Sequence, residues 1–134
     1  VLAQGLIDLG VLKCSLEEAL GEEGAEPSSI PLHRYFMHGP SHWIGSDVHD
    51  VGRYFDGTVP RPFKPGMAIT VEPGLYIPTK DETVGEELRG IGIRIEDDIL
   101  VTEDGNEVLT KTAPKTVAEV ESAVGVNPPK APSS

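Results

Sequence analysis

Apolar residues at the start of the chain recur at the spacing of an amphipathic helix. Leu2, Leu6 and Leu9 are three or four residues apart, so they fall on one face of a helical wheel. Gly10 interrupts this pattern and suits the residue that ends a helix. Ser15 is typical of a second helix start, because its hydroxyl can accept a hydrogen bond from a free backbone amide. This part of the chain therefore predicts two short helices.

Further along, apolar and polar residues alternate as they do in β-strands. Residues 67–72 read Met-Ala-Ile-Thr-Val-Glu, and the β-branched residues in this run favour a strand. Successive side chains of a strand point to opposite faces, so Ile69 and Val71 would lie on one face and Glu72 on the other. Two interpretations of Glu72 stay open: a solvent-facing strand end, or a carboxylate ligand held rigidly before the Pro73-Gly74 turn.

Residues 90–101 predict a second strand of the same kind. Alternation gives it an apolar face that we expect to pack against the core, formed by Ile91, Ile93 and Ile95. Arg94 and Glu96 would then be neighbours on the opposite face. They would form either an exposed ion pair, which contributes little to stability, or a metal-binding carboxylate beside a cation.

Glycine, proline and charged residues divide the rest of the chain. Residues 51–65 carry five glycines and prolines and predict an irregular loop, and residues 78–88 predict a polar surface excursion. Asp104-Gly105 is a hairpin turn signal, with residues 107–110 returning as the partner strand. A last helix is predicted to begin at Pro114.

Composition limits the classes of partner. The chain has 134 residues, enough for one core, and its 22 acidic against 11 basic residues give a formal charge of -11. That charge argues against a nucleic acid or an anionic membrane as partner. Cys14 is the only cysteine, which excludes an intrachain disulfide and favours a reducing, cytoplasmic compartment. We expect one domain over residues 1–125 and a disordered tail over residues 126–134, which is rich in proline and serine.

The segment 37–50 holds three of the four histidines and the only tryptophan. His38 and His42 are four residues apart, as in a helical zinc motif, but Gly39-Pro40 would disrupt such a helix and no glutamate follows His38. The segment therefore predicts a turn-rich loop that directs separate imidazoles, including that of His49, into one cavity. Taken alone, a histidine-rich loop is equally often a structural feature.

The order of these motifs resembles the C-terminal half of the pita-bread metallopeptidases, and most closely the Xaa-Pro aminopeptidase family. The matching stretches are His38-Gly-Pro-Ser-His-Trp-Ile-Gly-Ser-Asp-Val-His-Asp, then Pro65-Gly-Met-Ala-Ile-Thr-Val-Glu-Pro-Gly, then Arg89-Gly-Ile-Gly-Ile-Arg-Ile-Glu-Asp-Asp. The resemblance implies an α+β fold with a curved antiparallel sheet and flanking helices. It also implies release of the N-terminal residue from peptides with proline in second position.

The resemblance implies a metal site with two divalent ions, Mn²⁺ foremost, with Co²⁺ or Zn²⁺ as alternatives. His42, Glu72 and Glu96 match three of the family's five metal ligands, and Glu72 would also act on the proton of the attacking water. The other two ligands, aspartates on earlier strands, have no match in this chain. We therefore expect the chain alone to form an incomplete and inactive site.

The resemblance also implies roles in substrate binding. His38 and His49 match histidines that contact the substrate and stabilise the tetrahedral intermediate, and Arg94 matches an arginine beside the bridging carboxylate. The full-length enzyme is expected to be a homo-oligomer with a peptide substrate. Two alternatives stay open: a prolidase-type dipeptidase, and a non-catalytic binding module of the same fold that lacks the two aspartates.

Overall fold

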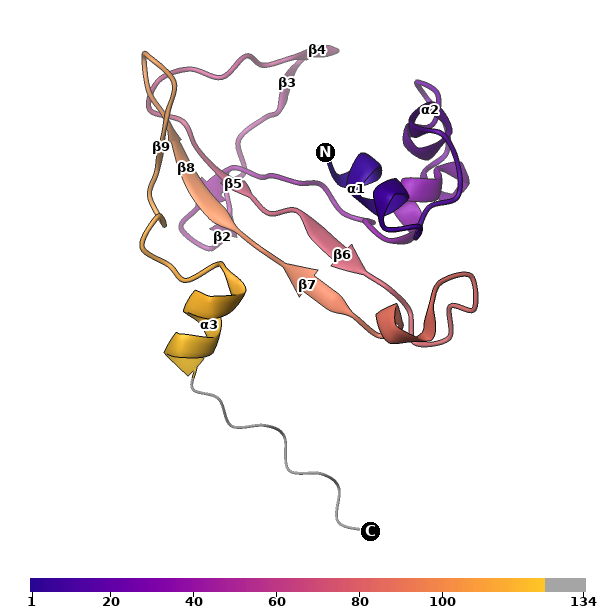
Figure 1. Cartoon of the computed structure of the whole chain (residues 1–134). Coiled ribbons are helices and arrows are strands. Elements are labelled where there is room, and N and C mark those ends of the chain that lie inside the picture. The colour runs from indigo at the N-terminus through magenta and orange to yellow at the C-terminus, as the bar shows by residue number, and fades with distance from the viewer. Residues whose placement is uncertain (125–134) are drawn as a thin grey trace.

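The computed structural model describes residues 1–124, so the tail predicted for residues 126–134 lies outside the described residues. Helices lie towards both ends and antiparallel strands lie between them (Figure 1). The α-helices are α1 (Leu2–Asp8), α2 (Leu16–Leu20) and α3 (Val117–Val124), and the 3₁₀ helices are η1 (Pro27–Ser29), η2 (Pro31–Arg34) and η3 (Glu86–Leu88). The strands are β1 (Ile44–Gly45), β2 (Val48–His49), β3 (Phe55–Asp56), β4 (Val59–Pro60), β5 (Ala68–Val71), β6 (Gly74–Tyr76), β7 (Gly92–Arg94), β8 (Asp97–Val101) and β9 (Asn106–Val108). None of the described helices combines the length and apolarity needed to cross a bilayer.

A long ribbon of two antiparallel strand pairs forms the middle of the molecule (Figure 1). β5 pairs with β8, β9 extends that sheet to three strands, and β6 pairs with β7. In this register Val71 lies opposite Asp97 and Gly74 lies opposite Arg94. Glu72 and Glu96 therefore reach the same level of the ribbon from its two strands.

The prediction of one continuous strand over residues 90–101 is wrong, because β7 ends at Arg94 and β8 begins at Asp97. The gap lies opposite Pro73, which has no amide hydrogen to donate to a ladder. Only a long bond from the Ile95 amide to the Pro73 carbonyl, at 3.3 Å, crosses this point. The interruption frees the backbone around Glu96 from the regular pleat.

The core lies where the two N-terminal helices meet the end of the ribbon beyond β6. Its buried residues are Ala3, Leu6, Val11, Leu12, Ala19, Tyr35, Ile77 and Val84. The predicted second helix start is confirmed, since the Ser15 hydroxyl accepts from the Glu18 amide at 3.2 Å and the Glu18 carboxylate accepts from the Ser15 amide at 2.8 Å. These helices fix one end of the ribbon on which the candidate site is built.

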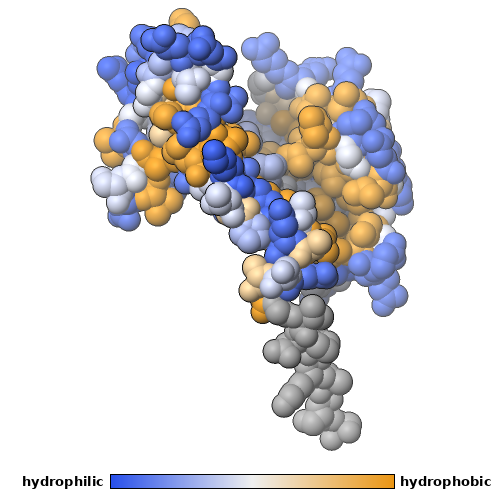
Figure 2. All heavy atoms as spheres, turned by 60° about the vertical axis from the view of Figure 1, so that its left-hand side comes forward, coloured by the Kyte–Doolittle hydropathy of each residue, from blue (hydrophilic) through white to orange (hydrophobic). Residues whose placement is uncertain are grey.

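The predicted core face of the second strand is wrong for the described residues. Ile91, Ile93 and Ile95 are 40%, 51% and 44% exposed, and Val71 on the first strand is 42% exposed. Alternation correctly separates the two faces, but no described segment covers the isoleucine face. The histidine-rich loop runs along the edge of β5 and brings His42 to the side of Glu72. Apolar surface is accordingly extensive on the view in Figure 2.

Three smaller predictions also need correction. Residues 51–65 contain the short hairpin β3–β4, whose turn includes Gly57 at a φ of +66°. Residues 78–88 are not wholly a surface excursion, because Asp81 and Val84 are buried. The last helix begins at Val117 and not at Pro114, since the Thr116 hydroxyl accepts from the Glu119 amide at 3.3 Å.

Asp81 is a buried carboxylate that ties three segments together. It accepts from the Tyr35 hydroxyl at 2.9 Å and from the Thr83 amide at 2.9 Å, and it pairs with the Arg34 guanidinium at 2.8 Å. The hydrogen bond from the Thr83 hydroxyl is the largest cause that lowers the pKa of Asp81 to about 2, and the other partners add to it against the opposing effect of burial. The ionised form is thus the one that the fold stabilises.

We expect Asp81→Asn to lower the free energy of unfolding at pH 7 by about 1–3 kcal/mol, because an amide cannot satisfy all these donors. The pKa of Asp81 is lower in the folded chain than in the unfolded chain. Its contribution is therefore complete above about pH 4 and disappears as the pH falls towards 2. Denaturant unfolding between pH 2 and pH 7 measures both effects. Glu82→Gln, an exposed neighbour, is the control; equal acid sensitivity of both variants would contradict the assignment.

Candidate active site

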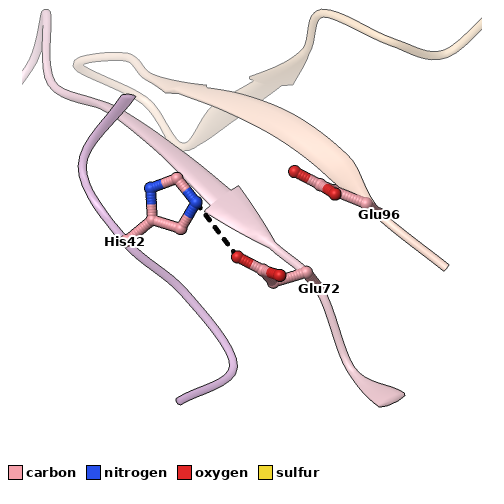
Figure 3. Close-up of side chains that lie close together, drawn as sticks. All are labelled: His42, Glu72 and Glu96. Atoms are coloured by element: carbon pink, nitrogen blue, oxygen red, sulfur yellow. Dashed lines mark ion pairs between the residues drawn. The ribbon is translucent and has the colours of Figure 1, made fainter. Parts of the chain in front are cut away.

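His42, Glu72 and Glu96 form a compact group of possible metal donors. Each offers one ligand atom, and these atoms lie within 4.8 Å of one another. Figure 3 shows the three side chains converging from the loop before β1, the end of β5 and the gap between β7 and β8. The sequence predicted these three residues as ligands, and the register of the ribbon explains how two carboxylates distant in sequence meet.

Hydrogen bonding fixes the tautomer of His42. Its Nδ1 lies 2.9 Å from the Trp43 carbonyl oxygen, which can only accept, so Nδ1 carries the hydrogen. In the neutral ring Nε2 then carries the lone pair, and Nε2 lies 3.1 Å from Glu72 Oε1. Either a proton on Nε2 or a metal ion between the two groups makes this approach favourable. An imidazole held this way by its second nitrogen is the usual form of a metal-binding histidine.

Glu72 is buried, with 8% of its surface exposed, which excludes the interpretation as a solvent-facing strand end. Oε1 accepts from the Thr70 hydroxyl at 3.0 Å, and Oε2 lies 3.5 Å from Nη1 of Arg94. The Glu72 amide donates to the Pro40 carbonyl at 2.8 Å, which binds the strand end to the histidine-rich loop. The carboxylate is therefore held in one orientation from both sides.

The donor set suits a divalent cation. One imidazole nitrogen and two carboxylates, without a thiolate, are ligands for Mn²⁺, Co²⁺, Fe²⁺ or Zn²⁺ in proteins. The three donor atoms lie close enough together to share one ion. The residues present thus fit the metal that the sequence predicts.

His38 and Arg94 belong to a second hydrogen-bonded group beside the carboxylates. His38 Nδ1 donates to the Gly39 carbonyl at 2.8 Å, so His38 Nε2 accepts, and it lies 3.0 Å from the Tyr76 hydroxyl. Arg94 Nε donates to the same hydroxyl at 2.8 Å, and Arg94 Nη2 lies 3.3 Å from His38 Nε2. A β-carbon at Gly74 would lie 2.6 Å from the Tyr76 hydroxyl, so this group requires glycine there.

His49 approaches the site from the short hairpin β1–β2. Its ring centroid lies 4.2 Å from that of His42, and the side chain is otherwise exposed. Val48, just before it, has a φ of 62°, which is rare for a β-branched residue. His49 is thus placed next to the metal donors without belonging to them.

A cavity of 290 Å³ connects these groups. It is lined by His38, Gly39, Ser41, His42, His49, Glu72 and Arg94. Five of the six predicted site residues line this cavity. The sixth, Glu96, lies in the group of donor atoms with His42 and Glu72. Sequence reasoning missed Thr70 and Tyr76, although alternation places both on the face of Glu72 and could have indicated them.

Known proteins share this arrangement of sequence and fold. The metallopeptidase family M24 matches residues 7–103. The chain is 49% identical over 121 residues to Xaa-Pro aminopeptidase of Escherichia coli (strain K12), covering 90% of this chain and 25% of that protein. It is 47% identical over 126 residues to Xaa-Pro aminopeptidase 1 of Streptomyces coelicolor, covering 90% of this chain and 23% of that protein.

Solved structures agree with the sequence matches. The aminopeptidase PepP of Pseudomonas aeruginosa superimposes with a TM-score of 0.79 at 47% identity, over 90% of this chain and 26% of that one. Aminopeptidase P from E. coli with the inhibitor Pro-Leu gives a TM-score of 0.75 at 48% identity, with the same coverage. The predicted pita-bread type of fold is thereby confirmed, and the chain spans about a quarter of the length of these relatives. By sequence and by fold, the chain belongs to metallopeptidase family M24.

Proposed function

We propose that this chain forms the C-terminal part of the catalytic domain of an Xaa-Pro aminopeptidase. The reaction is the release of the N-terminal residue from peptides with proline in second position. The observation that carries the proposal is the convergence of His42, Glu72 and Glu96 at a cavity that also holds two further histidines. The names of the matching relatives favour this activity over that of a prolidase-type dipeptidase.

The metal donors would hold two divalent ions, with Mn²⁺ as the proposed metal and Co²⁺ or Zn²⁺ as alternatives. When bound, such ions supply Lewis acidity that polarises a carbonyl and makes water a better nucleophile. His42 contributes its Nε2, and Glu72 and Glu96 contribute carboxylate oxygens from the two strands of the ribbon. We propose that the remaining donors come from outside this chain, in the parent enzyme.

The chain's own residues would divide the remaining work. Glu72 is held by Thr70 and Arg94 and lines the cavity, where it can take up the proton of the attacking water. His49 lies at the cavity beside His42, and it can donate to the carbonyl oxygen as negative charge develops. His38 and Arg94 form the wall that we expect to contact the peptide.

The proposal extends to the substrate, the compartment and the assembly state of the parent enzyme. Its substrate is a peptide, and the excess of acidic residues supports neither a nucleic acid nor a membrane as partner. A reducing, cytoplasmic compartment is supported by the single, unpaired Cys14. We propose that the parent enzyme is a homo-oligomer, which the mass of the purified enzyme in solution would reveal.

Titration of Mn²⁺ into this chain, followed by calorimetry, tests the metal site. We expect weak uptake of fewer than two ions, because the chain supplies only three donors. His42→Ala should abolish this uptake, and His33→Ala, outside the donor group, should leave it unchanged. Tight binding of two ions per chain would contradict the proposal that other donors are required.

A further inference from the structure

Thr70 occupies a position between two of the metal donors. It lies on β5, two residues before Glu72, and only 3% of its surface is exposed. Its hydroxyl oxygen accepts from the His42 amide at 3.0 Å and donates to Glu72 Oε1 at 3.0 Å. A single buried side chain thus joins the backbone of one donor to the carboxylate of another.

The direction of these two bonds is fixed. The His42 amide can only donate, so it occupies a lone pair of the Thr70 oxygen and leaves the hydroxyl hydrogen free. The hydrogen is then directed at Glu72, whose carboxylate can only accept in its ionised form. The same Glu72 oxygen faces Nε2 of His42 at 3.1 Å, so the three groups close a small ring around this oxygen.

Backbone pairing alone does not orient the carboxylate of Glu72. The Thr70 amide donates to the His42 carbonyl at 2.9 Å and the Glu72 amide donates to the Pro40 carbonyl at 2.8 Å, which places the loop beside the strand. Neither bond restrains the side-chain torsions of Glu72, and a glutamate has three of them. Among the described residues, the Glu72 carboxylate meets the Thr70 hydroxyl at 3.0 Å, His42 Nε2 at 3.1 Å and Arg94 Nη1 at 3.5 Å, and Thr70 is the buried neutral donor of the three.

We propose that Thr70 is a positioning residue of the metal site. Its hydroxyl sets the distance between His42 Nε2 and the Glu72 carboxylate before an ion arrives. Partners of this kind, which hold a ligand without touching the metal, typically change metal affinity about 10–100-fold when removed. The inference rests on the proposed metal site, and it concerns residues of this chain alone.

The test compares Thr70→Val with Thr70→Ser in the full chain. Valine keeps the shape of threonine and removes both hydrogen bonds, whereas serine keeps the hydroxyl. We expect valine to weaken Mn²⁺ binding about 10–100-fold by calorimetry and serine to restore it to within a few-fold. Thr83→Val is the matched control, because it removes the same kind of bond to a carboxylate, that of Asp81, away from the site.

A second measurement does not need the metal. Amide hydrogen exchange of the metal-free chain should be faster at His42 in Thr70→Val, on the order of tenfold, while the amide of residue 70 stays protected by its bond to the His42 carbonyl. Unchanged exchange at His42, or Mn²⁺ binding by the valine variant equal to that of the wild type, would overturn the proposal. Failure of the wild-type chain to bind Mn²⁺ would count against the proposed metal site instead, and the exchange result would still decide the role of Thr70.

Discussion

Replacing Glu72 by glutamine in the parent enzyme is expected to lower kcat on an Xaa-Pro peptide by a factor of about 1,000 or more. Because glutamine has nearly the same size as glutamate, we expect the fold to be retained. The amide weakens the contacts with Thr70 and Arg94, since one carboxylate oxygen is replaced by an NH₂ group. An amide cannot take up the proton of the attacking water, and such proton transfer contributes about 10²–10⁴-fold to the rate. It is also a poorer metal ligand than a carboxylate, which adds to the loss.

Steady-state kinetics, circular dichroism and metal analysis of the same preparation measure the effect of Glu72→Gln. Glu103→Gln is the control, since Glu103 is an exposed residue of the turn between β8 and β9. Activity of the Glu72 variant within a few-fold of the parent would show that Glu72 is only a buried structural carboxylate.

His49→Ala should lower kcat by about 100-fold or more without loss of metal, as for the removal of an oxyanion donor. The ring lies beside His42 but outside the group of donor atoms, so it can reach the substrate carbonyl without being a ligand. Because it would act on charge that appears only in the transition state, kcat should change more than KM.

Kinetics on an Xaa-Pro peptide, with metal analysis, separate the roles of His49. His33→Ala provides a matched control, because His33 is the one histidine outside the cavity. Loss of metal together with activity would make His49 a ligand or a scaffold residue. An unchanged kcat with intact metal would leave it without a catalytic role.

The strand pattern correctly predicts that Glu72 and Val71 face opposite sides, but not which side is buried. Burial depends on which segment lies over each face, and alternation holds no information about that. The histidine-rich loop runs along the edge of β5 and brings His42 to the side of Glu72, whereas the isoleucine face of β7 is left exposed among the described residues. The same limit explains why alternation alone wrongly predicted that the isoleucines of the second strand pack against a core.

Alternation places Thr70 and Tyr76 on the face of Glu72, but it does not show which groups they contact. Both are ordinary strand residues, and their importance arises from partners distant in sequence: His42 lies 28 residues before Thr70, and Arg94 lies 18 residues after Tyr76. The interruption of the second strand at Ile95 likewise depends on Pro73 of the opposite strand. By contrast, His42, Glu72 and Glu96 carry unusual chemistry in a specific order, so their meeting could be predicted.

We propose that His42, Glu72 and Glu96 hold a divalent ion together. Anomalous diffraction from crystals of the parent enzyme grown with Mn²⁺ tests it most directly. We predict an anomalous peak at coordination distance from Nε2 of His42 and from a carboxylate oxygen of both Glu72 and Glu96. A Mn²⁺ peak elsewhere in the molecule, with no density between these three side chains, would contradict the account.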